Sequence, residues 1–93
     1  MRILRARVKP ENADAWNRLT DEQITEHLVG TDGVLHWHVG RPIAGHDNEY
    51  VIVSLWRDMD AVRAFAGASG RTVPFRDHGQ VAESITVEMF ELE

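Results

Sequence analysis

The sequence contains no cysteine, which excludes disulfide bonds, a thiolate nucleophile and cysteine-bound zinc or iron–sulfur sites. It is also poor in positive charge, because 10 scattered lysines and arginines stand against 15 aspartates and glutamates, for a net charge of −5. Nucleic acids and anionic membranes are therefore not expected as partners, since both are bound by clustered positive charge. No apolar stretch approaches the roughly 18 residues that a membrane span requires, and no apolar signal segment begins the chain. We expect a cytoplasmic protein.

The apolar content of the chain suits one folded domain. Apolar residues make up 43% of the sequence, as in ordinary globular proteins. We expect residues 1–93 to form a single domain, since domains usually contain about 100–150 residues. A domain of this size buries only about 60–65% of its unfolded surface, so self-association would stabilise it. An oligomer is expected.

Hydrophobic periodicity predicts four strands and two helices in the order β-α-β-β-α-β. The predicted strands cover residues 2–8, 34–42, 49–56 and 84–92. An amphipathic helix is predicted over residues 11–28, with Pro10 in its first turn. A shorter helix is predicted between an Asp58 N-cap and Gly70. Residues 69–83 show no sustained period and predict an irregular connection.

This order is typical of the ferredoxin-like α+β fold, in which a four-stranded antiparallel sheet carries both helices on one face. From the alternation of residues, six side chains are assigned to the helix-facing side: Leu35, Trp37, Val39, Val51, Val53 and Leu55. Six others are assigned to the uncovered face: His36, His38, Tyr50, Ile52, Ser54 and Trp56. An uncovered face of this composition predicts a partner.

The segment from residue 56 to 67, WRDMDAVRAFAG, is similar to the W-x-S-x-E-A-x-x-x-F stretch of the antibiotic biosynthesis monooxygenase superfamily. Together with the strand order, this resemblance spans essentially the whole chain. It implies a dimeric α/β barrel, in which two sheets pair face to face in a homodimer and each subunit has a ligand pocket between its sheet and helices. Activities known in the family include cofactor-independent oxygenation of polycyclic aromatic phenols, oxidative haem degradation, and ligand binding with no established reaction.

The resemblance also allows the haem-degrading branch to be compared with this chain. Those members use an asparagine on the first strand, a tryptophan on the second helix and a proximal histidine near the end of that helix. By position this chain has Arg7, Phe65 and either Phe75 or His78. Two of the three residue types differ, so haem degradation ranks third among the functions that the resemblance implies. No cofactor is expected, in agreement with the absence of a glycine-rich dinucleotide fingerprint.

The first hypothesis is therefore a small monooxygenase that acts on a small or polycyclic aromatic, phenolic substrate without a cofactor. Arg7 would stabilise the developing anion, and His78 or His27 would be the base. The aromatic ring would be held by Trp16, Trp56, Phe65 and Phe75. The alternative is a non-catalytic, ligand-binding or stress-responsive homodimer, formed through the sheet face, that sequesters a small aromatic or hydrophobic molecule.

Two further pairs of residues remain open to interpretation. His36 and His38 are spaced to chelate a metal from one strand, but the local sequence supplies no third ligand, so no metal site is predicted. A structural place in a dimer interface is the alternative. Arg5 and Arg7 share one face of the first strand and need anionic partners, either Glu88 or Glu91 on the last strand or an anionic ligand.

Overall fold

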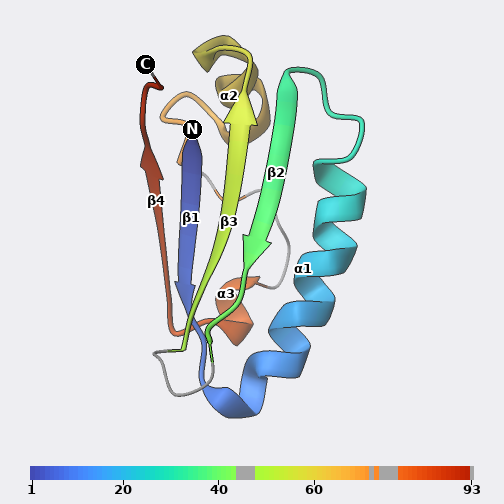
Figure 1. The fold of residues 1–93 in the computed structure, drawn as a ribbon, viewed down its shortest axis with the longest axis vertical. Helices are drawn as coiled ribbons and strands as arrows, with labels where there is room; N and C mark the ends of the chain where they lie inside the picture. The colour runs from blue at the N-terminus through green and yellow to red at the C-terminus, as the bar shows by residue number, and fades with distance from the viewer. Residues whose placement is uncertain (44–47, 72, 74–77, 93) are drawn as a thin grey trace.

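The protein is represented by a computed structural model that describes residues 1–43, 48–71, 73 and 78–92 (Figure 1). Its strands form an open, antiparallel four-stranded sheet in the order β2-β3-β1-β4. They are β1 (Arg2–Arg7), β2 (Val34–Gly40), β3 (Glu49–Trp56) and β4 (Ser84–Met89). The helices are a 3-10 turn (Pro10–Asn12), α1 (Ala13–His27), α2 (Met59–Ala66) and α3 (His78–Val81).

The predicted order of strands and helices is confirmed, and the fold is ferredoxin-like α+β. The differences lie at the ends of elements. The 3-10 turn at Pro10 comes before α1, and α2 ends at Ala66, well before Gly70. Three predicted strands run beyond the observed ends, because backbone pairing stops earlier than the apolar pattern does. The connection predicted as irregular contains the short helix α3.

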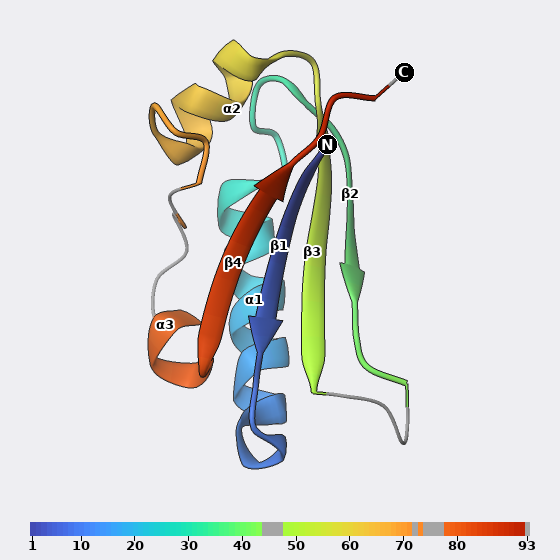
Figure 2. The same ribbon diagram turned by 90° about the vertical axis from the view of Figure 1, so that its left-hand side faces the viewer.

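The two faces of the sheet differ in what covers them. Figure 2 shows the described helices together on one side of the sheet, and we call the other side the open face. Residues that pair directly across antiparallel strands share a face. Leu4 and Ala6 of the central strand β1 are each 1% exposed and lie beneath the helices. Their partners on β3, Ile52 and Tyr50, therefore lie on the same side and are also buried.

On β3 the predicted assignment of faces is wrong. The helices cover Tyr50, Ile52 and Ser54, of which Ser54 is only 2% exposed. Three residues predicted to face the helices lie instead on the open face: Val51, Val53 and Leu55. Both sides of this strand are rich in apolar residues, so alternation alone did not distinguish them. Trp56, which was predicted to lie on the uncovered face, lies on the helix-covered side as well and is partly buried against the core.

On β2 the predicted faces hold for four residues: Trp37 and Val39 on the helix-facing side, and His36 and His38 on the open face. Leu35 is the exception, because its side chain is 59% exposed. The register shifts between Val34 and His36, so Leu35 is the extra residue of a β-bulge and points away from the core.

The core lies between the sheet and the helices. Trp16 of α1 is 1% exposed, and its ring centroid lies 6.1 Å from that of Tyr50 on β3. Four polar side chains are buried in this layer: Arg2, Thr20, Gln23 and Ser54. None of the helices in the described part of the chain has both the length and the apolar composition of a membrane-crossing segment.

Candidate functional site

Two cavities border the turn that leads from β3 into α2. The first, of about 650 Å³, lies where β1 begins and where β3 and β4 end, beside the first turn of α2. Its walls are mostly apolar and include Leu55, Trp56, Met59, Val62, Met89 and Phe90. The charged residues that line it are Arg2, Arg57, Asp58 and Glu91. A cavity of this size lies within the range of about 300–1,000 Å³ that small-molecule sites occupy.

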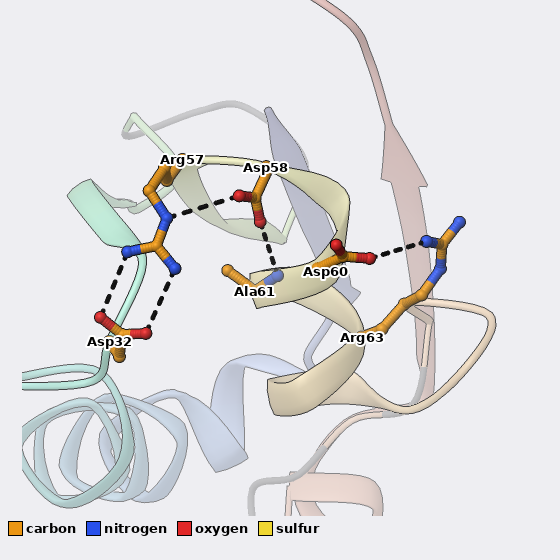
Figure 3. A network of polar contacts seen from close by, with 6 residues as sticks. All are labelled: Asp32, Arg57, Asp58, Asp60, Ala61 and Arg63. Atoms are coloured by element: carbon orange, nitrogen blue, oxygen red, sulfur yellow. Dashed lines mark hydrogen bonds and ion pairs between the residues drawn. The ribbon is translucent and has the colours of Figure 1, made fainter.

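Polar contacts hold the turn between the two cavities. Asp58 is the N-cap of α2, as predicted, and its carboxylate accepts a hydrogen bond of 2.9 Å from the amide of Ala61. Arg57 donates two hydrogen bonds to Asp32, at 3.2 and 3.3 Å, and one of 3.4 Å to Asp58 (Figure 3). The pKa of Asp32 is lowered chiefly by the hydrogen bond from Arg57. The pKa of Asp58 is lowered chiefly by the bond from Ala61.

Gly33 brings the loop before β2 against α2. The carbonyl of Gly33 accepts a hydrogen bond of 2.7 Å from the amide of Arg57. With φ at +88°, a Cβ at this position would lie 2.3 Å from the Cβ of Ala61, closer than two carbon atoms can approach. The turn and the loop are therefore in contact only because residue 33 has no side chain.

Arg2 is a buried arginine beside the first cavity. The residue is only 2% exposed, and it lies on the helix-facing side of the sheet, paired with Ser54 and Met89. Its Nε donates a hydrogen bond of 3.0 Å to the carbonyl of Gly70, and the guanidinium carbon lies 5.7 Å from the ring centroid of Phe65. Burial lowers the pKa of Arg2 from its ordinary value.

Trp56 and Phe65 form an aromatic pair between the two cavities. Their ring centroids lie 4.9 Å apart at an interplanar angle of 41°. The indole Nε1 of Trp56 donates a hydrogen bond of 2.8 Å to the hydroxyl of Ser54, which fixes the orientation of the ring. Trp56 lines the first cavity and Phe65 lines the second.

The second cavity, of about 540 Å³, lies between the end of α1 and α2. It is more acidic than the first, because Asp32, Asp58 and Asp60 line it together with one arginine, Arg57. His27 also lines it, with a side chain that is 30% exposed and has its Nε2 3.9 Å from a carboxylate oxygen of Glu26. This location is consistent with the prediction that His27 lies at a pocket.

Arg7 faces the other side of the sheet. Its guanidinium is 48% exposed on the open face, 4.0 Å from Glu49, and it lines neither of these two cavities. Arg5 lies beside it and donates a hydrogen bond of 2.9 Å to Glu88 and one of 3.3 Å to Glu49. The predicted pairing of Arg5 with Glu88 is therefore confirmed, while Glu49 was not foreseen. Hydrogen bonds to both carboxylates raise the pKa of Arg5, with Glu88 the stronger cause.

The remaining predicted residues are dispersed. Trp16 is buried in the core and lines neither cavity. His78 belongs to α3, but its side chain and the whole of Phe75 lie outside the described residues. The structure thus brings together Trp56, Phe65 and His27 around one turn and leaves Arg7 and Trp16 elsewhere.

Sequence reasoning missed two arginines, Arg2 and Arg57. Alternate residues of a strand point to the same side, so Arg2 lies on the same side of β1 as the apolar residues Leu4 and Ala6. The periodicity of β1 was the signal that could have identified it. For Arg57 no comparable signal was present, because its partner Asp32 lies 25 residues earlier in the chain.

His36 and His38 lie on the open face, opposite Leu55 and Val53 of β3. Their direct neighbours on the adjacent strand are therefore apolar rather than metal-ligating. Across the part of the chain that the structure describes, no group of three or more histidine, aspartate or glutamate side chains is placed to hold a metal ion.

The model of the antibiotic biosynthesis monooxygenase family matches residues 1–71 of this chain. A comparison with curated proteins gave no match. Among solved structures, the chain is similar to one described as an antibiotic biosynthesis monooxygenase, with a TM-score of 0.75 and 15% identity over 99% of this chain and 96% of that one.

Two further solved structures are similar over nearly the whole chain. The structure of Rv0793 from Mycobacterium tuberculosis has a TM-score of 0.71 and 22% identity, covering 99% of this chain and 94% of that one. A mutant of MhuD with two manganese protoporphyrin IX molecules bound per active site has a TM-score of 0.72 and 17% identity, covering 98% and 91%. Identities this low show a shared fold alone.

Proposed function

The chain belongs to the antibiotic biosynthesis monooxygenase family, and on that basis we propose that it is a monooxygenase of small or polycyclic aromatic substrates, phenols in particular. The observation that carries this proposal is the first cavity, a largely apolar space of about 650 Å³ beside the ring of Trp56. We further propose that residues 1–93 form one domain and that the protein is cytoplasmic.

The reaction needs no metal or flavin when the substrate has a methylene group activated by its phenolic ring system. Loss of a proton gives an anion, which passes one electron to dioxygen. The substrate radical and superoxide then combine to a peroxide, and loss of water leaves a carbonyl group. Overall, CH₂ and O₂ become C=O and H₂O, so the substrate supplies every electron.

The proposed roles follow the positions of the side chains. Trp56 holds the aromatic ring, and Phe65 supports Trp56 from α2. His27 lines the second cavity and not the first, so it is the candidate base for a substrate that reaches both cavities, and His78 is the alternative. Arg7 faces away from both cavities, so stabilisation of the anion in the first cavity requires a different cation.

Oxygen uptake in the presence of anthrone, a tricyclic compound with an activated methylene group, tests this function. We expect consumption of one O₂ per anthrone and formation of anthraquinone with a metal chelator present. Replacement Trp56→Ala should lower kcat/KM by about tenfold or more, because it removes the wall that positions the ring. The control Trp37→Ala, on β2 outside both cavities, should change kcat/KM by less than about threefold. Oxygen uptake no faster than the uncatalysed reaction across a panel of polycyclic phenols would refute the proposal.

A non-catalytic ligand-binding protein is the second candidate. It is favoured by the lining of the first cavity, whose described residues include no histidine to act as a base. Calorimetric binding of an aromatic ligand without oxygen uptake would support this candidate over the monooxygenase.

Haem does not fit the described cavities well. The described residues that line the first cavity include no histidine, cysteine or tyrosine, and its methionines, Met1, Met59 and Met89, would be haem ligands of a type that usually acts beside a histidine. The second cavity has His27, but Asp32, Asp58 and Asp60 beside it would repel the propionates of haem. A haem titration without a shift of the Soret band would exclude this function.

We also propose that the protein is a homodimer formed through the open face. The centre of this face is apolar, with Ile3 next to Val53 in the middle of the sheet. The ion pairs of Arg5 and Arg7 with Glu49 and Glu88 lie beside this centre. Arg5 lies in the middle of the central strand, opposite Val51 and Thr86, so paired charges lie within this face as well as at its edge. Many protein interfaces are about as polar as the rest of the surface.

A further inference from the structure

We propose that the side chain of Arg57 is a movable strap between the two cavities, and that one elongated aromatic ligand occupies both when this strap leaves Asp32. This inference rests on the proposed function only in so far as the first cavity binds an aromatic molecule. It makes Arg57 the residue that determines how long that molecule can be, and it gives the ligand a route from Trp56 to His27.

Arg57 lies between the two cavities. Among the described residues, Arg57 and Asp58 are the two that line both of them. The guanidinium reaches from the start of α2 to Asp32 in the loop before β2, and Figure 3 shows it bridging two carboxylates. The contacting rings of Trp56 and Phe65 belong to one lining each, so the cavities are close neighbours.

The side chain of Arg57 is held by weak contacts. It is 54% exposed, and the side chain of Asp32 that it contacts is 89% exposed. The hydrogen bonds to Asp32 are 3.2 and 3.3 Å long, and the one to Asp58 is 3.4 Å. Ion pairs this exposed stabilise a fold little, because water solvates both ions when they separate. The strap can therefore leave Asp32 at small cost.

The backbone beneath the strap is fixed. The amide of Arg57 donates a hydrogen bond of 2.7 Å to the carbonyl of Gly33, and Asp58 accepts one from the amide of Ala61 as the N-cap of α2. Asp58 must stay in place to cap the helix, whereas the side chain of Arg57 can move without undoing the turn. Such a movement is fast, since exposed side chains change rotamer within picoseconds to nanoseconds.

A carboxylate remains near the guanidinium after it leaves Asp32. The Nε of Arg57 already contacts Asp58 at 3.4 Å, and Glu91 belongs to the lining of the first cavity. Asp60 in the second cavity is bound to Arg63 at 3.4 Å, so it does not draw the strap to that side. A strap released from Asp32 therefore keeps a partner for its positive charge.

Release of the strap lets one molecule use both cavities, whose volumes are about 650 and 540 Å³. The ring of Trp56 lines the first of these spaces and His27 lines the second. A two-ring phenol needs only the first cavity, whereas a longer, rigid phenol needs the space that the guanidinium occupies. The length of the bound molecule therefore reports the position of the strap.

Two neutral phenols of different length test the inference: 2-naphthol and the longer 6-(4-hydroxyphenyl)-2-naphthol. Isothermal titration calorimetry gives their dissociation constants, and intermolecular nuclear Overhauser effects (NOEs) show which methyl groups each probe contacts. We expect 2-naphthol to give NOEs to the methyl group of Met59 in the first cavity. The longer probe should give NOEs both to Met59 and to the methyl group of Ala64 in the second cavity.

Variants then identify the strap. Arg57→Ala removes it and Asp32→Asn removes its charged partner, so both should bind the longer probe about threefold or more tightly, as expected when an exposed ion pair no longer competes. Binding of 2-naphthol should change by less than about twofold. Arg63→Ala and Asp60→Asn are matched controls, because they break a neighbouring ion pair of α2 and leave Arg57 in place. Both controls should bind the two probes as the unmodified protein does.

NMR spectra report whether each variant is folded, and if Arg57→Ala is not, Asp32→Asn still tests the strap. The inference is overturned if the folded variants bind the longer probe no more tightly than the unmodified protein. It is also overturned if the longer probe contacts the first cavity alone in all of these proteins. The expected binding without oxygen uptake would support the strap and refute the monooxygenase. If neither probe binds, the aromatic site fails and the strap fails with it.

Discussion

At the scale of single residues, the buried polar side chains determine how the aromatic residues are held. Ser54 lies beneath the helices, 2% exposed, and accepts the hydrogen bond from the Trp56 indole. A buried donor that loses its acceptor costs about 1–3 kcal/mol. Ser54 therefore connects the stability of the fold to the orientation of the ring that lines the first cavity.

The replacement Ser54→Ala tests this connection. We expect the free energy of unfolding to fall by about 1–2 kcal/mol, because the Nε1–H of Trp56 loses its partner in a partly buried position. The control Ser69→Ala, at an exposed serine that accepts a hydrogen bond from the amide of Arg71, should cost less than about 0.5 kcal/mol. Urea denaturation measures both free energies of unfolding. Equal losses in the two variants would show that the hydrogen bond from Trp56 to Ser54 does not stabilise the fold more than an exposed one does.

The residues of the candidate site were only partly predictable from the sequence. Trp56 and Phe65, predicted to hold the aromatic ring, lie beside the two cavities and contact each other, because both belong to one short segment with a strong pattern. Their role in binding stays a prediction. The burial of Arg2 was not foreseen, for a physical reason. A buried arginine contradicts the usual rule that charge lies outside, and only the tertiary packing of α2 and Gly70 over β1 shows why it is tolerated.

At the scale of elements, the order of helices and strands along the chain was predictable. The face of the sheet on which each side chain of β3 lies was not. Turn residues and the Asp58 N-cap separate the elements clearly, and the cap is confirmed by its bond to Ala61. On β3, apolar residues on both sides removed the signal that would have set its faces. On β2, the bulge at Leu35 depends on pairing with β3, which no local pattern records.

The loop before β2 supports a second prediction, about two glycines. Gly33 and Gly30 both have positive φ, +88° and +78°, so alanine at either position should cost about 1–2 kcal/mol. A Cβ at Gly33 also overlaps Ala61, whereas nothing lies within 4 Å of one at Gly30. We therefore expect Gly33→Ala to lower the thermal unfolding midpoint distinctly more than Gly30→Ala. The addition of Ala61→Gly should recover part of the difference, and no recovery would show that the overlap is not the cause.

The start of α2 should make stability depend on pH. Asp32 and Asp58 have pKa values lowered below the ordinary value by contacts that exist only in the folded chain. Their stabilisation is complete above the unfolded-state pKa, about 3.9, and is lost as the pH falls through the lowered folded-state values. The urea midpoint should therefore decrease between pH 5 and pH 3, and Asp32→Asn should reduce that decrease. An unchanged decrease in the Asp32→Asn variant would show that the ion pair of Asp32 with Arg57 is not the cause.

At the scale of the whole molecule, no described helix covers the open face of the sheet, so in a monomer its apolar side chains would be exposed to water. Ile3, Val51, Val53 and Leu55 bring four apolar side chains to one flat surface. Stable protein interfaces bury about 1,600 Å² in total, which a four-stranded face can supply. A second copy of the chain would remove these side chains from water.

Light scattering at micromolar concentration tests the dimer. The unmodified protein should have twice the mass of one chain, and Val53→Asp should be a monomer, because an unpaired carboxylate at the centre of the interface is costly to bury. Val29→Asp, the same change at a residue that is 57% exposed after α1, should remain dimeric. A monomeric mass for the unmodified protein would contradict the proposal.

The three tryptophans occupy three different surroundings, and this distribution has an optical consequence. Trp16 is 1% exposed in the core, Trp37 is 38% exposed on an edge strand, and Trp56 lines the first cavity. Acrylamide should therefore quench mainly the red-shifted emission of Trp37, while emission from Trp16 stays blue-shifted and protected. A molecule that enters the first cavity changes the emission of Trp56, so the protein carries its own fluorescent reporter of occupancy.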